Sequence, residues 1–286
     1  MLIGVPKEIK TDEYRVALIP STVKELVARG HKVEVETHAG YEAGISDEDY
    51  SAVGARLVRT ADAIFQSADL IVKVKEPLSS ERSKLRRGQA IFTYLHLAPD
   101  REQTTQLLAS GVTAIAYETV TDTAGKLPLL APMSKVAGRM APQVAAHFLE
   151  RPHRGRGILL GGIDDVPAAQ VLVLGGGVVA RHATEVAIGM GADVTIITRS
   201  AETMERLSSH FAGRVRVLAG QQMIGALCAS SDVVIGAALV TGGAAPKLIS
   251  KQIVAMMKPG SVIVDVSIDQ GGCAETSQPT THSQPS

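Results

Sequence analysis

The sequence predicts an α/β protein of two doubly wound domains that are joined by a long helix. Short apolar, β-branched runs alternate with amphipathic stretches along the chain. Several of these runs are apolar almost throughout, as in parallel sheets that are covered on both faces. With 286 residues, the chain is long enough for two domains of ordinary size. We place them at residues 1–130 and 131–273.

The first half alternates predicted strands and helices. The helix at 21–29 shows the pattern, because Val23, Leu26 and Val27 form an apolar face between polar residues. We expect strands at residues 2–6, 32–37, 70–75, 90–96 and 112–118, and helices at 21–29, 60–67, 79–86 and 99–110.

The second half begins with residues 131–150, which read as one long helix with a kink expected at Pro142. Its length suits an interdomain connector, and its composition fits equally an ordinary buried helix of either domain. From Ala274 onwards no large apolar residue occurs, so we expect a disordered tail over 274–286. The second sheet would then end at Ile268 without a closing helix. Its strands are expected at residues 171–174, 193–198, 214–219, 232–238 and 261–268.

Charge and cysteine usage exclude several kinds of partner. Lys plus Arg and Asp plus Glu both number 29, whereas nucleic-acid or anionic-membrane surfaces require a basic footprint. Cys228 and Cys273 form no CxxC pattern, so we expect neither a metal site nor a disulfide framework. No apolar run reaches the length of a membrane span, and the N-terminus has no signal-peptide region. These features predict a cytoplasmic protein that binds no nucleic acid and no membrane.

The segment VLVLGGGVVA at 171–180 carries the most specific pattern. Its glycines and Ala180 match G-x-G-x-x-G/A between a predicted strand and a predicted helix. The first glycine permits a tight turn, the second lets the backbone approach a pyrophosphate, and the small third residue allows close packing of helix on strand. We therefore predict a Rossmann nucleotide-binding domain, in which the cofactor contacts are Gly175, Gly177, Val178 and Ala180.

The end of the next strand bears on which dinucleotide is bound. An NAD-binding domain often places Asp or Glu there, to accept hydrogen bonds from the ribose hydroxyls. This chain has Thr198, Arg199 and Ser200 instead. These side chains favour the 2′-phosphate of NADP, because a carboxylate would repel that phosphate. Alternatively, Arg199 is a solvated surface residue and the site accepts NAD or both cofactors.

Four polar residues stand near predicted strands where ligands bind. Arg15 follows the first strand, and its guanidinium fork suits a carboxylate. Lys75 and His96 end two strands at the carboxyl edge of the first sheet, and a histidine there suits acid–base chemistry. Asp269 follows the last strand. A surface arginine, a structural histidine and a helix-capping aspartate are the alternatives. Lys73 and Lys75 share a face by strand alternation, so at least one of them is expected to be solvated only.

Several motifs together resemble alanine dehydrogenases. They recur in the order of that family across residues 1 to about 282: GVPKEIKTDEYRVALIP, VKVKEP, FTYLHLA, YETV, LPLLAPMSKVAGR, LLGG and VDVSIDQGGC. The resemblance implies reversible oxidative deamination of L-alanine to pyruvate and ammonium, with hydride transfer to NAD or NADP, and a homo-oligomer. It is less similar to the related transhydrogenase subunits, which should lack the pairing of Lys75 with His96.

The resemblance also implies roles for individual residues. Arg15 and Lys75 would hold the substrate carboxylate, with Lys75 also polarising the carbonyl or imine. His96 would be the acid–base, and Asp269 would orient water or ammonia and neutralise the iminium charge. Ser134 would touch the cofactor pyrophosphate.

The chain departs from the family at four places. Thr198 replaces the usual acid, Lys135 stands where the family has Glu, and residues 218–222 lack the serine-bearing stretch that lies near the adenosine. Family members also continue beyond the point where this chain stops. The alternative function is therefore a shortened homologue that binds nucleotide or a partner without efficient turnover.

Overall fold

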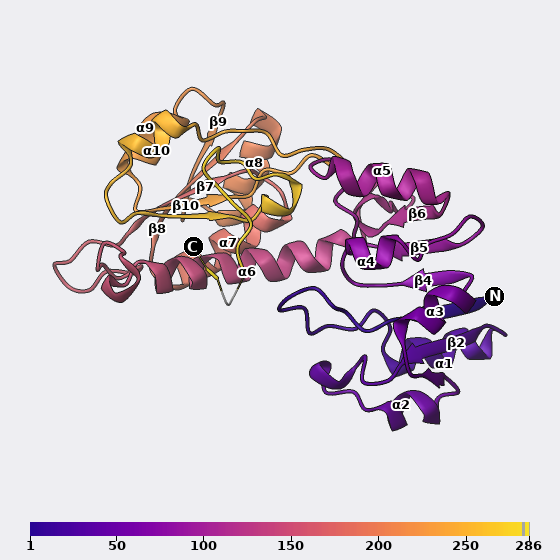
Figure 1. Cartoon of the computed structure of the whole chain (residues 1–286). Helices are drawn as coiled ribbons and strands as arrows, with labels where there is room; N and C mark the ends of the chain where they lie inside the picture. Colours follow the sequence, from indigo (N-terminus) through magenta and orange to yellow (C-terminus); the bar gives the residue numbers. More distant parts are fainter. Residues whose placement is uncertain (282–283, 286) are drawn as a thin grey trace. The chain divides into compact units, whose positions relative to one another are not determined.

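The computed structural model describes residues 1–281 and 284–285, which form two compact units. The first unit is Met1–Thr121 with a short stretch that starts at Thr280, and the second is Asp122–Pro279. Each unit is a parallel sheet with helices on both faces (Figure 1). By its contacts the chain divides after Thr121, so residues 122–130 and the long helix that follows them belong to the second unit. In the part of the chain that the structure describes, no helix is long and apolar enough to cross a membrane.

The first unit contains a six-stranded sheet in the order β3-β2-β1-β4-β5-β6. The strand order reverses between β1 and β4, which confirms the doubly wound topology. The strands are β1 (Leu2–Val5), β2 (Lys32–Glu36), β3 (Arg56–Val58), β4 (Leu70–Val72), β5 (Ala90–Thr93) and β6 (Thr113–Ala116). The helices are α1 (Pro20–Ala28), α2 (Asp47–Ala52), α3 (Ala61–Ser67), α4 (Ser79–Arg82) and α5 (Arg101–Ser110), with the 3₁₀ turns η1 (Tyr41–Ala43) and η2 (Tyr117–Thr119).

Each face of this sheet is covered by its own set of helices. Val23 of α1 and Tyr50 of α2 pack with the side chains of β1 and β2 on one face. Ile64 of α3 and Leu107 of α5 pack with β4 and β5 on the other. A Cβ at Gly4 of β1 would overlap Ile64, so α3 lies directly on the central strand. This coverage explains why the central strands are apolar almost throughout.

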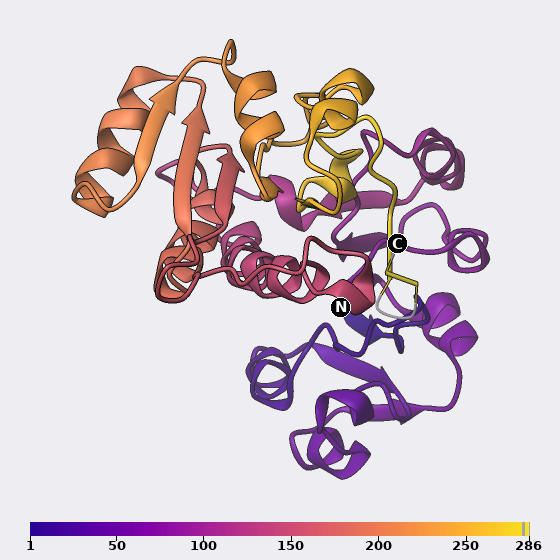
Figure 2. The ribbon, with the colours of Figure 1, turned by 90° about the vertical axis from the view of Figure 1, so that its left-hand side faces the viewer.

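The second unit contains a five-stranded parallel sheet in the order β11-β10-β7-β8-β9 (Figure 2). The strands are β7 (Gln170–Leu174), β8 (Asp193–Thr198), β9 (Arg216–Ala219), β10 (Val233–Gly236) and β11 (Val262–Asp265). The helices are α6 (Leu130–Phe148), α7 (Val178–Gly189), α8 (Ala201–Phe211), α9 (Ile224–Ser230) and α10 (Lys251–Met256), with the 3₁₀ turns η3 (Arg151–His153) and η4 (Ile268–Gln270).

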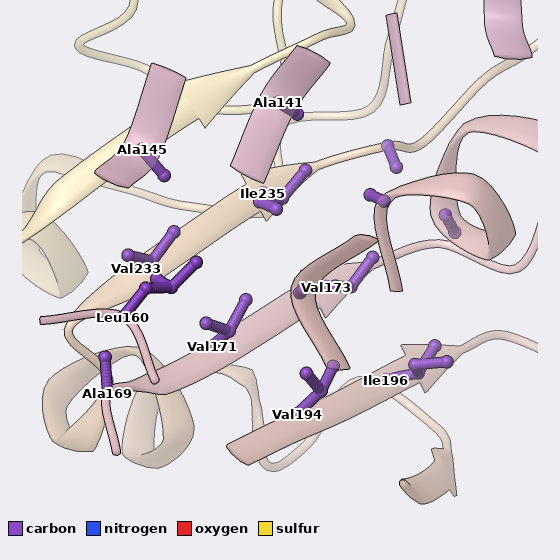
Figure 3. Close-up of a cluster of buried hydrophobic side chains, with 14 of the residues drawn as sticks. Ala141, Ala145, Leu160, Ala169, Val171, Val173, Val194, Ile196, Val233 and Ile235 are labelled. Carbon is purple, nitrogen blue, oxygen red and sulfur yellow. The ribbon is translucent and has the colours of Figure 1, made fainter. Parts of the chain in front are cut away.

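Helix α6 is part of the core of this second unit. Its Ala141 and Ala145 are buried against Val171, Val233 and Ile235 of the central strands (Figure 3). Small residues also bring α6 close to α7, because a Cβ at Gly138 would lie 2.6 Å from the carbonyl oxygen of Val179. The predicted long helix is therefore confirmed. Its second half is a buried helix of one domain, which is one of the two interpretations that the sequence allows.

The beginning of the predicted disordered tail is packed rather than free. Ala274 is fully buried and pairs with Ile249, and the Glu275 N–H donates to the carbonyl of Ile249 at 2.9 Å. The small Ala274 fits beneath the sheet without the large apolar side chain on which the prediction depended. The prediction for residues 282, 283 and 286 lies outside the described residues.

Candidate functional site

The glycine turn between β7 and α7 has the form that the sequence predicts. Gly175 has a φ of +136°, and a Cβ there would overlap the backbone of Ala237. A Cβ at Gly176 would overlap Thr203, whereas a Cβ at Gly177 would meet nothing within 4 Å. Gly177 is the N-cap of α7, and no side chain caps the first N–H groups of this helix. Ala180 is fully buried against the sheet.

A cavity of about 370 Å³ opens beside this turn. It lies at the carboxyl ends of β7, β8 and β10, which is where doubly wound sheets bind ligands. Its walls include all three glycines, Thr198 to Ser200, and the segment from Ala237 to Val240. An open backbone at Gly177, a helix N-terminus and an adjoining apolar cavity fit the pyrophosphate and adenosine of a dinucleotide.

The residues that the sequence predicts near the ribose 2′ position lie in the wall of this cavity. Thr198 is buried, and its Oγ1 would lie 2.8 Å from a Cβ at Gly176, so its side chain faces the turn. Arg199 is exposed at the rim, and Ser200 caps α8 by accepting a hydrogen bond from Thr203 N. Among the described residues that line the cavity there is one cation, Arg199, and no carboxylate.

A second arginine, which was not predicted, lies at the turn. Arg206 of α8 donates from Nη2 to the carbonyl oxygen of Gly176 at 2.8 Å. This bond fixes the turn and leaves positive charge beside it. Ser134, on α6, is half-buried and is not part of the cavity wall, so its contact with the pyrophosphate stays a prediction. The neighbouring Lys135 is exposed.

In the first unit, Arg15 lies in the loop between β1 and α1 and grips a carboxylate of its own chain. Its Nε donates to Glu13 Oε1 at 2.7 Å, and its Nη2 donates to Glu13 Oε2 at 2.5 Å. The hydrogen bonds to Glu13 raise the pKa of Arg15. Burial opposes the charged form of Glu13, but the bonds from Arg15 and the charge of Lys75 lower the pKa of Glu13. The fork therefore has the geometry for a carboxylate, and Lys75 lies near the same anion.

The lysines after β4 differ from the prediction. The strand ends at Val72, so both lysines lie in the loop that follows it. Lys73 is fully buried between Glu8 and Glu81, at 3.0 Å and 2.8 Å, and Lys75 is half-buried. The expectation that at least one lysine is only solvated is wrong, because two buried carboxylates hold Lys73 and the half-buried Lys75 lies within electrostatic range of Glu13.

These buried charges shape the loop that carries Lys75. Burial disfavours the charged form of Lys73, but the facing carboxylates outweigh it and raise the pKa of Lys73. Burial also raises the pKa of Glu8. The other oxygen of Glu8 accepts the main-chain N–H of Val74 at 2.6 Å. Glu8 thus fixes both the side chain and the backbone directly before Lys75.

His96 lies three residues beyond the end of β5 rather than on the strand. Its φ of +49° is in the left-handed region, and its ring stacks on that of Tyr94 with centroids 5.9 Å apart. The buried Glu118 accepts the main-chain N–H of His96 at 2.7 Å and that of Leu95 at 3.2 Å. Tyr94 is also within electrostatic range of Arg15. Arg15, Lys75 and His96 therefore lie in the loops that follow the carboxyl ends of β1, β4 and β5.

Asp269 belongs to the second unit, where it is exposed on η4. The loop that carries it is organised by Asp265, whose carboxylate accepts the main-chain N–H groups of Cys273 at 2.8 Å and Ala274 at 3.0 Å. Lys247 donates to the carbonyl of Gly271 in the same loop. Sequence reasoning missed Asp265, which reads as an ordinary strand residue.

Two family models match the chain along almost its whole length. Residues 4–137 match the N-terminal domain of alanine dehydrogenase/PNT, and residues 141–286 match the C-terminal domain. The chain belongs to the alanine dehydrogenase/PNT family. The motifs that resemble alanine dehydrogenases in the sequence are thereby confirmed, and so is the class of NAD-dependent oxidoreductases.

Similar proteins agree with this assignment. The chain is 53% identical to an alanine dehydrogenase of Halomonas elongata and 50% identical to one of Mycolicibacterium smegmatis, and in both cases it is covered completely and spans 77% of the relative. A solved L-alanine dehydrogenase matches with a TM-score of 0.87 at 50% identity, covering 100% of this chain and 79% of its own. A solved transhydrogenase of Sinorhizobium meliloti matches with a TM-score of 0.78 at 29% identity. The match covers 98% of this chain and 83% of the transhydrogenase chain.

Proposed function

We propose that this chain catalyses the reversible oxidative deamination of L-alanine to pyruvate and ammonium, with hydride transfer to a nicotinamide dinucleotide. The observation that carries the proposal is the grouping of Arg15, Lys75 and His96 at one edge of the first sheet. This grouping supplies an anion fork, a second cation and an acid–base, which are the groups that a 2-oxo or 2-amino acid needs. Alanine dehydrogenases at about half identity over the whole chain support the same reaction.

Each of these residues has a chemical task in the proposed reaction. Arg15 binds the substrate carboxylate bidentately, in the way in which it holds Glu13. Lys75 adds positive charge near that carboxylate and polarises the carbonyl or imine at the adjacent carbon. When bound, the nicotinamide would take up the hydride from Cα of alanine.

His96 performs the proton transfers of the proposed reaction. In the deaminating direction, water adds to the imine that results from oxidation, and a carbinolamine forms. His96 removes the proton of the carbinolamine hydroxyl as the C–N bond breaks and ammonia leaves, so that the C=O bond of pyruvate forms. Asp269 orients the water or ammonia and neutralises the iminium charge. The reverse direction uses the same groups with the proton transfers inverted.

The decisive experiment is a reductive amination assay with pyruvate, ammonium and NADH or NADPH. We expect turnover by the wild type and by His38→Asn, a matched histidine variant outside the site. His96→Ala should abolish turnover and keep nucleotide affinity, because the glycine turn belongs to the other unit. Nucleotide binding without turnover by the wild type would overturn the proposal in favour of a binding protein. Full activity of His96→Ala would exclude the acid–base role.

We further propose that the site accepts NADP. Two observations support it: no carboxylate lines the cavity among the described residues, and Arg199 and Arg206 place positive charge beside the turn. In fluorescence titrations, NADPH should bind more tightly than NADH, and Arg199→Asp should shift the preference toward NADH. Equal affinities in the wild type, or an unchanged ratio in Arg199→Asp, would show that Arg199 is a solvated surface residue.

A further inference from the structure

Three side chains at the end of α6 form a cluster that the proposed reaction does not use. His147 lies in the last turn of α6, Glu150 follows the helix, and His153 is the last residue of η3. All three are exposed, and one possible ligand atom from each lies within 4.8 Å of the others. The rings of His147 and His153 have centroids 3.9 Å apart. The sequence had led us to expect no metal site.

The backbone of this segment holds the three residues in place. Glu150 N donates to the carbonyl of His147 at 3.2 Å, and His153 N donates to the carbonyl of Glu150 at 3.1 Å. Gly155 N donates to that same carbonyl at 3.0 Å. A Cβ at Gly155 would overlap the main chain of Phe148 and Leu149, so this glycine lets the chain fold tightly against the helix end. The spacing of the side chains is therefore set by a well-bonded turn.

We propose that His147, Glu150 and His153 form a surface site for a divalent first-row transition-metal cation such as Zn²⁺ or Ni²⁺. Two imidazoles and one carboxylate are ligands that these cations accept. In a tetrahedral zinc site with bonds of about 2.1 Å, ligand atoms lie about 3.4 Å apart. The exposed side chains therefore have to move closer together by up to about 1.4 Å, since their ligand atoms lie within 4.8 Å of one another. Water would complete the coordination.

The ligand set also discriminates among cations. Mg²⁺ and Ca²⁺ prefer six or more oxygen ligands, whereas this cluster offers two nitrogens and a single carboxylate. Arg151 and Arg154 place positive charge in the same turn, which opposes any cation. Both are exposed, so water and salt screen that repulsion. The site is thus selective for borderline cations, and its affinity is moderated by the neighbouring charges.

A bound cation would cross-link the end of α6 to η3. A cation that binds the native arrangement and not the unfolded chain stabilises the fold in proportion to its free concentration. The proposal does not depend on the dehydrogenase activity, because no residue of the cluster takes part in the proposed reaction. Its test is a binding measurement.

The experiment is isothermal titration of the tag-free chain with ZnCl₂, NiCl₂ and MgCl₂ at about pH 7.5, where free imidazole is neutral. We expect one Zn²⁺ or Ni²⁺ per chain and much weaker Mg²⁺ binding. His147→Ala and His153→Ala should each weaken Zn²⁺ binding by at least about tenfold. His38→Asn, which removes an exposed histidine at a left-handed position that Asn tolerates, should leave the affinity unchanged.

A second measurement keeps the test independent of any folding defect. Zn²⁺ should raise the thermal midpoint of the wild type and should not raise that of the double variant of His147 and His153, whose midpoint without metal should match the wild type. Absence of saturable Zn²⁺ and Ni²⁺ binding to the wild type would overturn the proposal. So would wild-type affinity in the double variant, or Mg²⁺ binding as tight as that of Zn²⁺.

Discussion

Replacing Glu118 with Gln tests whether this buried carboxylate positions His96. Glu118 accepts the main-chain N–H groups of His96 and Leu95 at 2.7 Å and 3.2 Å. Hydrogen bonds to a charged group contribute about 1.5–3 kcal/mol each. The left-handed conformation of His96 costs about 1–2 kcal/mol, which one such bond offsets. Gln keeps the size of the side chain but loses the charge, so the stabilisation of the His96 conformation should fall by about the contribution of one such hydrogen bond.

This loss should appear in the turnover number rather than in substrate binding. A change of about 1.5–3 kcal/mol corresponds to roughly a tenfold to a hundredfold decrease in kcat. The KM for pyruvate should change little, because Arg15 and Lys75 keep their own contacts. Nucleotide affinity should also stay constant, since the glycine turn lies in the second unit.

Steady-state kinetics with pyruvate as the varied substrate measure both parameters. Glu102→Gln provides the control, because the side chain of Glu102 is 72% exposed on α5. Urea unfolding of both variants separates a global loss of stability from a local effect on His96. A kcat of Glu118→Gln equal to that of Glu102→Gln would refute the positioning role.

Two further predictions concern stability. Lys73→Met leaves the carboxylates of Glu8 and Glu81 buried without a counter-charge, so urea unfolding should show that the free energy of unfolding falls by about 3–5 kcal/mol. The control Lys84→Met breaks a more exposed ion pair with Asp62 and should lower it by less than about 1 kcal/mol. Burial raises the pKa of Tyr50 from 10.0 to about 12, so the folded state favours the neutral phenol. The stability that results is complete below pH 10 and is lost as the pH rises toward 12. The free energy of unfolding of Tyr50→Phe should therefore fall less steeply across that range than that of the wild type. An equal dependence on pH in the two proteins would contradict this assignment.

The sequence predicted elements well where a local pattern was long. The apolar run at 193–198 coincides with β8, and the glycine turn formed where the fingerprint placed it. The first sheet was harder to predict. Strand β3 has only three residues, too few for a periodic signal, and its Arg56 is fixed by an ion pair to Glu34 of the neighbouring strand. Such a pairing between distant segments has no local signature.

Strand ends were predicted too late in the first sheet for a related reason. In the run LIVKVK, apolar and polar residues alternate from Val72 to Lys75, yet β4 ends at Val72. Beyond that point the main-chain N–H of Val74 donates to the side chain of Glu8 and not to a neighbouring strand. The alternation does not separate buried from exposed side chains here, because Val72, Lys73 and Val74 are all buried. The partner of each backbone group also depends on residues far away in the sequence.

The candidate residues are supported by the same physical device in both units. Loops at the carboxyl edge leave the sheet ladder, so their N–H groups need other acceptors. A carboxylate that is buried or half-buried supplies them: Glu8 before Lys75, Glu118 at His96, and the half-buried Asp265 for the loop that bears Asp269. A carboxylate can accept several bonds at once, which a neutral side chain of the same size cannot match. The reactive side chains could be found from local motifs, whereas the carboxylates that hold them become visible only once the chain is folded.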